Sequence, residues 1–139
     1  MEKILVSACL LGENCRYKGD NQKNDKVLAL SKKYQIIPIC PEQMGGLATP
    51  RNPAERVGNK VISSAGDDVT KEYLSGAEKA LEIAKQNDVK FCVLKANSPS
   101  CGKDVIYDGT FSGTKTKGNG VTTELLLKNG YKVLTENDL

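Results

Sequence analysis

The sequence contains no histidine, and only 5% of its residues are aromatic. The absence of histidine removes the commonest catalytic base and the imidazole ligand that many protein metal sites use. Any metal site must therefore be built from thiolates, carboxylates, backbone groups or a non-protein ligand. Any general acid or base must likewise come from another residue type.

Long hydrophobic runs are also missing. No segment approaches the roughly 18 continuous apolar residues expected of a membrane-spanning helix. The amino-terminal stretch MEKILVSACLLG has only a short apolar run and no cleavage pattern of a signal peptide. We therefore expect an intracellular, cytoplasmic protein without a membrane segment.

Neither positive nor negative charge dominates the sequence. The formal net charge is +3, and the lysines are dispersed among acidic residues rather than grouped. With few aromatic residues and no basic run, we do not expect binding to nucleic acid. A small anionic ligand would suit this charge balance, and the sequence leaves the oligomeric state open.

Five cysteines are present, and no two of them form a C-x-x-C pair of the kind that often supplies ligands to structural zinc. Their number is odd, and a reducing compartment keeps thiols free, so we do not expect a framework of disulfides. The role of each must be argued from its position. The five are Cys9, Cys15, Cys40, Cys92 and Cys101.

The hydrophobic pattern predicts four strands that alternate with helices. The strand segments are residues 3–9, 35–40, 90–95 and 131–135, and the helical segments are residues 25–34, 67–88 and 119–129. This alternation is typical of the α/β class. We expect one domain, residues 1–139, with a three-layer, Rossmann-like open sheet that is mainly parallel, has about four core strands and carries helices on both faces. Pro38 favours an edge position for the second strand.

Three cysteines follow three of the predicted strands. Cys9 and Cys40 end the first and second strands, and Cys101 lies in the loop after the third. Parallel strands point their carboxyl ends toward one edge of the sheet, where ligands bind. We therefore predict that these thiols meet there and bind one metal centre, which we expect to be an iron–sulfur cluster. The alternative for each is a small buried hydrophobic residue.

The other two cysteines are interpreted differently. The strand register places Cys92 in the core. Cys15 lies in a loop beside charged residues and is ambiguous between a redox partner, an accessory residue and a ligand. Clusters are typically held by four thiolates. With three, one iron would keep an open site that could act as a Lewis acid toward a soft sulfur atom.

Polar residues near these cysteines are candidates for chemistry. Glu42 follows Cys40 by two residues and is the best candidate for a general acid or base, although it could be a solvated loop acid. Ser98 and Ser100 precede Cys101 and could bind cluster, substrate or water, or only shape the Ser-Pro turn.

A segment rich in glycine and lysine, GTKTKGNGVTTELL, precedes the last predicted helix. It fails the phosphate-loop pattern, because Asn119 and Gly120 stand where lysine and serine or threonine are required. A helix amino terminus still suits an anion such as a phosphate. The predicted substrate contacts here are Lys117, Gly118, Asn119 and Gly120. Arg51 and Arg56 are further candidate anion contacts, and a flexible exposed loop is the alternative.

Seven motifs occur in order along nearly the whole chain: VSACLLG, CRYKG, CPEQMGGLATPRNPAE, GDDVT, LKANSPSCG, IYDGTFSG and GNGVT. Together they resemble the thiouracil desulfidase family. The resemblance implies a [4Fe–4S] cluster ligated by Cys9, Cys40 and Cys101. It also implies that Glu42 and Ser98 take part in non-redox hydrolysis of the C–S bond of thiouracil or thiouridine monophosphate, which yields uracil or UMP and sulfide.

Three other functions remain open at the level of sequence. The chain could be a non-catalytic module that binds a nucleotide. It could carry a cluster that donates sulfur or electrons, which predicts a fourth protein ligand, most simply Cys15. It could also be an enzyme that uses the Cys101 thiol alone as its nucleophile, which predicts activity without metal.

Overall fold

A four-stranded parallel sheet forms the centre of the computed structural model, which describes all 139 residues. The strand order is β2-β1-β5-β8. The strands are β1 (Lys3–Ser7), β2 (Gln35–Ile39), β5 (Cys92–Leu94) and β8 (Val133–Thr135). Each lies within a segment that the hydrophobic pattern predicts as a strand. Pro38 lies in β2, at the edge of the sheet, where a missing amide donor is tolerated.

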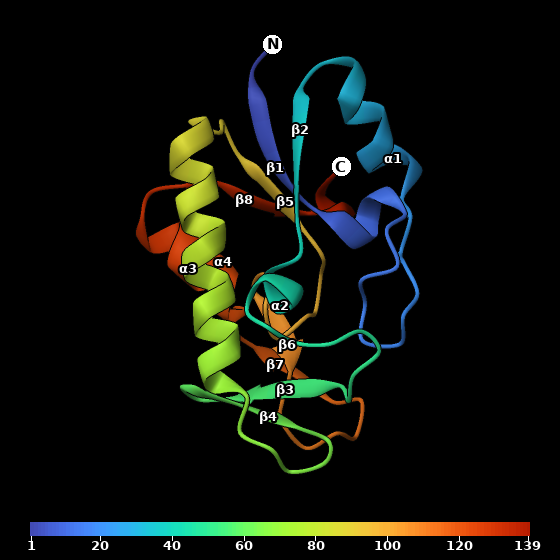
Figure 1. Cartoon of the computed structure of the whole chain (residues 1–139), viewed down its shortest axis with the longest axis vertical. Helices are drawn as coiled ribbons and strands as arrows, with labels where there is room; N and C mark the ends of the chain where they lie inside the picture. Colours follow the sequence, from blue (N-terminus) through green and yellow to red (C-terminus); the bar gives the residue numbers. More distant parts are fainter.

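Helices cover both faces of this sheet (Figure 1). Helix α1 (Asp25–Ala29) lies on one side, whereas α3 (Thr70–Asn87) and α4 (Val121–Lys128) pack on the other. Successive strand residues point to opposite faces. The α3–α4 side buries Leu5, Ala80, Ala84, Cys92, Leu94, Leu126 and Val133. The α1 side buries Ile4, Val6, Leu10, Val27 and Val93. The predicted α/β class, with a mainly parallel sheet between helical layers, is confirmed.

Two antiparallel hairpins lie beyond the carboxyl ends of the sheet strands (Figure 1). One pairs β3 (Ala54–Val57) with β4 (Lys60–Ser63), and the other pairs β6 (Val105–Tyr107) with β7 (Lys115–Lys117). The hydrophobic pattern predicts a long loop for residues 96–117, between the third predicted strand and the last predicted helix. The β6–β7 hairpin in this segment shows that this prediction is wrong. Short helical turns complete the chain: η1 (Ala8–Leu11), η2 (Leu30–Lys32), α2 (Pro41–Met44) and η3 (Glu136–Asp138).

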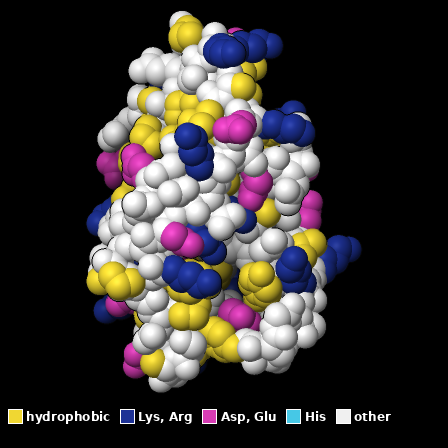
Figure 2. Space-filling model, turned by 90° about the vertical axis from the view of Figure 1, so that its right-hand side faces the viewer, with side chains coloured by type: hydrophobic (Ala, Val, Ile, Leu, Met, Phe, Trp, Pro, Cys, Tyr) yellow, Lys and Arg dark blue, Asp and Glu magenta, His cyan; other side chains and the backbone are white.

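The surface seen in Figure 2 mixes charges of both signs. Lysine and arginine side chains are scattered among aspartate and glutamate rather than gathered in a stripe on this face (Figure 2). No helix of the structure combines the length and the hydrophobicity needed to cross a bilayer.

Two glycines let α2 and the turn after it lie directly against α3. A Cβ atom on Gly76 of α3 would lie 1.9 Å from the carbonyl oxygen of Pro41, and one on Gly45 would lie 1.9 Å from that of Glu72. Such distances leave no room for any side chain. The position of α2, and of the residues that precede and follow it, therefore depends on this backbone contact.

Replacing Gly76 by alanine tests the contact. Alanine favours a helix over glycine by about 1 kcal/mol, but an overpacked contact costs about 1–3 kcal/mol, and here the obstacle is rigid backbone. We expect Gly76→Ala to lower the free energy of unfolding in urea by about 1 kcal/mol or more. The exposed Glu78→Ala change on the same helix serves as the control. A Gly76→Ala variant as stable as this control would contradict the account.

Candidate metal centre and active site

The carboxyl ends of β1, β2 and β5 meet at one cavity of about 420 Å³. Cys9 lies in η1, directly after β1, and Cys40 is the residue that precedes α2. Cys101 lies in the turn that follows β5. All three line the cavity, although they are far apart in sequence. The structure therefore brings together the three cysteines that the sequence places after parallel strands. Their role as ligands stays a prediction.

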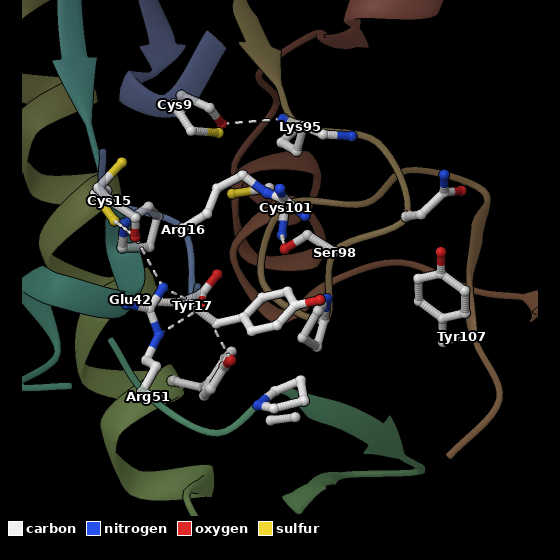
Figure 3. A pocket seen from close by; sticks show the side chains of 18 of the residues that line it. Cys9, Cys15, Arg16, Tyr17, Glu42, Arg51, Lys95, Ser98, Cys101 and Tyr107 are labelled. Carbon is white, nitrogen blue, oxygen red and sulfur yellow. Dashed lines mark hydrogen bonds and ion pairs between the residues drawn. The ribbon is translucent and has the colours of Figure 1, made fainter. Parts of the chain in front are cut away.

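The remaining cysteines have different surroundings. Cys15 also lines the cavity, and its backbone carbonyl oxygen accepts a hydrogen bond from the Cys40 thiol at 3.8 Å (Figure 3 shows Cys9, Cys15 and Cys101 around the same space). Cys92 belongs to the hydrophobic core on the α3–α4 side and does not reach the cavity. Burial raises the pKa of its thiol to about 12. Cys92 is thus the core residue that the strand register predicts, whereas Cys15 is part of the site.

Two thiols of the cavity, those of Cys40 and Cys101, keep their protons at neutral pH because their pKa values are raised. Burial, followed by the charge of Glu42, raises the pKa of Cys101 to about 12. The hydrogen bond with Cys15, followed by burial, raises the pKa of Cys40. Metals bind the thiolate form of cysteine. A metal centre at this cavity would therefore displace these protons.

The arrangement of the donors distinguishes between kinds of metal centre. No three histidine, cysteine, aspartate or glutamate side chains are grouped so that they could hold one metal ion. In an iron–sulfur cluster each thiolate binds a different iron, so the thiolates lie farther apart than the ligands of one ion. Three thiols from separate loops on one cavity wall, with no imidazole in the chain, fit a cluster better than a single ion.

Glu42 is held in place by Arg51. The Glu42 Oε2 atom accepts hydrogen bonds from Arg51 Nη2 at 2.8 Å, from Arg51 Nε at 3.3 Å and from the Tyr73 hydroxyl at 3.2 Å. The Arg51 and Glu42 side chains are only 9% and 17% exposed. Glu42 Oε1 has no hydrogen-bond partner within the chain. One carboxylate oxygen is therefore fixed, while the other remains available at a cavity that Glu42 lines.

Arg51 has no donor left for a ligand. Besides Glu42, its guanidinium donates to the carbonyl oxygens of Ala48 and Cys15 and to the Thr49 hydroxyl. These bonds use all five N–H groups that a guanidinium possesses. The sequence suggests Arg51 as a contact for a substrate anion. In the structure, the anion that Arg51 contacts is the carboxylate of Glu42.

Ser98 shapes the turn that carries Cys101. Its Oγ atom accepts hydrogen bonds from the backbone N–H groups of Ser100 and Cys101, both at 3.0 Å. The hydroxyl hydrogen has no acceptor within the chain, and Ser98 lines the cavity. A hydroxyl group can accept and donate at once. Ser98 can therefore hold the turn and still donate to a molecule in the cavity.

The amino terminus of α4 binds this same turn. The N–H groups of Val121 and Thr122 donate to the carbonyl oxygens of Pro99 and Ser100, at 2.9 and 2.8 Å. The Thr123 hydroxyl donates to the Cys101 carbonyl oxygen at 2.7 Å. The sequence predicts that the amides at this helix terminus bind an anion. In the structure they are bonded to the backbone around Cys101.

Five predicted substrate contacts lie away from the cavity. Ser100 is fully buried and hydrogen-bonded to Thr122. A Cβ atom on Gly120 would lie 2.4 Å from the Ser100 carbonyl, so this glycine allows close packing. Lys117, Gly118 and Asn119 line a separate hollow, together with Arg56, which pairs with Glu124. Ser100 does contact Cys101, whose thiol donates to the Ser100 hydroxyl at 3.8 Å, but none of the five residues lines the cavity. A substrate role for them stays a prediction.

Several cavity residues were not predicted. In the sequence, Tyr73 is only one of the apolar positions on one face of the predicted helix 67–88. In the structure its hydroxyl donates to Glu42. Arg16 and Tyr17 belong to the motif CRYKG, which carries the family resemblance but suggests no role by itself. Lys95 follows β5, Tyr107 ends β6, and Phe111 lies between β6 and β7. They too belong to motifs of the resemblance, LKANSPSCG and IYDGTFSG, which suggest no role by themselves. All line the cavity.

Comparisons relate the chain to known proteins. The model of the 2-thiouracil desulfurase family matches residues 4–138. The uncharacterized protein YbbK of Bacillus subtilis (strain 168) is 44% identical over an alignment of 146 residues, which covers 98% of the chain and 97% of YbbK. The solved structure of the [4Fe–4S]-dependent thiouracil desulfidase TudS is 45% identical, with a TM-score of 0.95 over 100% of the chain and 93% of its own.

The ion pair of Arg51 and Glu42 is buried, so we expect Arg51→Gln to reduce stability more than the same change at a lysine whose ion pair is exposed. Breaking a buried ion pair leaves an unpaired charge and costs about 3–5 kcal/mol. Because this pair is slightly exposed, we expect Arg51→Gln to lower the unfolding free energy of the metal-free protein by about 2 kcal/mol or more.

The matched control is Lys90→Gln. Lys90 pairs with Glu2 at 2.9 Å, but both side chains are more than half exposed, and such pairs contribute little to stability. Urea unfolding of both variants makes the comparison. Equal losses of stability would show that Arg51 does not hold Glu42 as described.

Proposed function

Because the chain belongs to the 2-thiouracil desulfurase family, we propose that it is a [4Fe–4S]-dependent thiouracil desulfidase. It hydrolyses the C–S bond of thiouracil or thiouridine monophosphate to uracil or UMP and sulfide. The observation that carries this proposal is that three thiols and the carboxylate of Glu42 line one cavity. We also propose that residues 1–139 form one domain, with this site at the carboxyl edge of its sheet.

Cys9, Cys40 and Cys101 would hold the cluster. When bound by only three thiolates, a cluster of this kind supplies an open iron, a Lewis acid suited to a soft sulfur atom of the substrate. The cavity volume of about 420 Å³ lies within the range of small-molecule sites. The reducing cytoplasm, where thiols stay free, is the compartment that suits such a site.

Glu42 is the general base of the proposed reaction. With Oε2 held by Arg51 and Tyr73, its free Oε1 atom accepts a proton from a water molecule. The oxygen of that water adds to the ring carbon that bears sulfur. The C–S bond then breaks as the added hydroxyl becomes the carbonyl oxygen. The sulfur takes up the proton held by Glu42 and the proton lost from that hydroxyl, so thiouracil and water give uracil and hydrogen sulfide. No electrons are transferred, so the reaction requires no nicotinamide or flavin.

Ser98 would assist by hydrogen bonding. Its Oγ atom is fixed by two backbone amides, which leaves the hydroxyl hydrogen directed to another acceptor. A water molecule or a ring heteroatom can take that hydrogen bond. Ser98 would therefore orient the reactants rather than carry the proton.

One observation favours a second candidate function. Cys15 lines the same cavity as the three proposed ligands, and its carbonyl oxygen accepts a hydrogen bond from the Cys40 thiol at 3.8 Å. If Cys15 were a fourth ligand, no iron would remain open, and the cluster would suit donation of sulfur or electrons instead.

Anaerobic reconstitution with iron and sulfide, followed by addition of 4-thiouracil, tests the proposed activity. We expect loss of the thiocarbonyl absorbance together with release of one sulfide per uracil. Since a general base contributes about 10²–10⁴-fold to a rate, Glu42→Gln should lose activity by a similar factor and keep its iron and sulfide. A full cluster without turnover in the wild type would refute the activity, and full activity in Glu42→Gln would remove Glu42 from the reaction.

Cysteine-to-serine variants separate the two candidate functions. We expect Cys9→Ser, Cys40→Ser and Cys101→Ser to lose most cluster iron, and Cys15→Ser to retain it. Cys92→Ala controls for loss of a buried cysteine that lies outside the cavity. Iron and sulfide analysis after anaerobic reconstitution gives the answer. Loss of the cluster in Cys15→Ser would favour four-thiolate ligation and the second function.

A further inference from the structure

Arg16 and Tyr17 line the cavity but have no part in the chemistry described so far. They follow Cys15 in a tight turn that spans residues 16–20. The turn is closed by backbone hydrogen bonds between Arg16 and Asp20 and between Gly19 and Arg16. Gly19 has φ +79°, a conformation that favours glycine. The backbone N–H of Arg51 also donates to the Tyr17 carbonyl oxygen at 2.8 Å, so the turn is fixed from two sides.

Arg16 is the cavity cation with the most unused hydrogen-bond donors. The three cations that line the cavity are Arg16, Arg51 and Lys95. The donors of Arg51 are all engaged, and Lys95 pairs with Glu136 at 2.8 Å and donates to the Ala96 carbonyl. Arg16 pairs with Asp20 through Nη1 alone. Its Nε and Nη2 atoms have no partner in the chain, and its side chain is 23% exposed.

Tyr17 gives the cavity a flat apolar surface. Its side chain lies across the cavity, between the Glu42–Arg51 pair and Ser98 (Figure 3). The chain has seven aromatic residues, five tyrosines and two phenylalanines. Four of them line the cavity: Tyr17, Tyr73, Tyr107 and Phe111. A chain poor in aromatic residues thus places most of them where a planar heterocycle would bind, and planar rings stack well on such side chains.

We propose that Arg16 and Tyr17 are the substrate-binding residues of this cavity. Arg16 donates hydrogen bonds from Nε and Nη2 to an oxygen of the substrate, and Tyr17 packs against the pyrimidine ring. This inference rests on the proposed function. A guanidinium recognises either a phosphate or a ring carbonyl through the same oxygen chemistry. Arg16, rather than Arg51, is therefore the arginine assigned to the ligand.

Binding of the products tests the assignment without any turnover. The affinities of uracil and UMP are measured by calorimetry on the reconstituted wild type, Arg16→Gln and Lys18→Gln. Lys18 is the matched control, because it belongs to the same turn and lies 5.8 Å from the Tyr17 ring centre but does not line the cavity. Hydrogen bonds to charged groups correspond to roughly 10-fold or more in affinity.

The two oxygen sources give different results. If the partner is the phosphate, Arg16→Gln lowers the affinity for UMP roughly 10-fold and leaves the affinity for uracil unchanged. Arg16→Lys then restores part of the affinity for UMP. If the partner is the ring carbonyl, Arg16→Gln weakens both ligands. Affinities of Arg16→Gln that match those of Lys18→Gln for both ligands would overturn the assignment. Unfolding in urea and cluster iron content check that each variant is intact.

The role of the Tyr17 ring is tested by replacing it with an aliphatic or another aromatic side chain. Loss of a stacking surface weakens binding by roughly 10-fold, so Tyr17→Leu should bind uracil and UMP that much more weakly, and Tyr17→Phe should bind both like the wild type. Wild-type affinity in Tyr17→Leu would remove the ring from the site.

The proposed function and this inference fail in distinguishable ways. A wild type that binds UMP and depends on Arg16, yet leaves 4-thiouracil intact, would contradict the desulfidase activity and keep the binding assignment. A wild type that releases sulfide while Arg16→Gln keeps both affinities would contradict the assignment alone. A reconstituted wild type that binds neither product would overturn the assignment, whereas the turnover of 4-thiouracil decides the proposed activity by itself.

Discussion

The hydrogen bonds of Arg51 hold together the loops on which the candidate site depends. The guanidinium binds the Glu42 carboxylate, the Cys15 carbonyl oxygen and residues 48–49, and the Arg51 amide binds the Tyr17 carbonyl oxygen. Arg51 itself lies outside any helix or strand. Loops usually gain their mobility from a lack of such contacts. Here one residue, through its buried side chain and its amide, fixes the Glu42 carboxylate, the Cys15 backbone and the turn that carries Arg16 and Tyr17 relative to one another.

Much of the framework could be predicted because it depends on periodicity and topology alone. The strands that precede Cys9, Cys40 and Cys101 follow from short apolar runs, and parallel pairing then brings their carboxyl ends to one edge. The partners of loop side chains could not be predicted in this way. Whether Arg51 binds an external anion or Glu42 depends on the path of residues 41–51, to which no sequence period applies. The α4 amides are a similar case, since only folding brings the Ser100 carbonyl onto them.

The site contains more thiols than the proposed ligation needs. Four cysteines line the cavity, so an open iron would not result from a shortage of sulfur. The Cys15 carbonyl oxygen is held by Arg51 Nη2 at 3.0 Å and accepts from Cys40 Sγ at 3.8 Å, which restrains the backbone at that residue. The same arginine that positions Glu42 therefore also limits how Cys15 can approach a cluster. The residues proposed for binding, base catalysis and ligation are thus connected through Arg51.

The central claim is that a cluster at this cavity keeps one iron free for the sulfur of the substrate. Mössbauer spectra of the anaerobically reconstituted wild type, recorded with and without 4-thiouracil, test it directly because the method reports each iron site. The account predicts that one of the four irons changes its signal when the ligand binds, while the other three keep theirs. Spectra that are identical with and without the ligand, from protein with a full cluster, would contradict it.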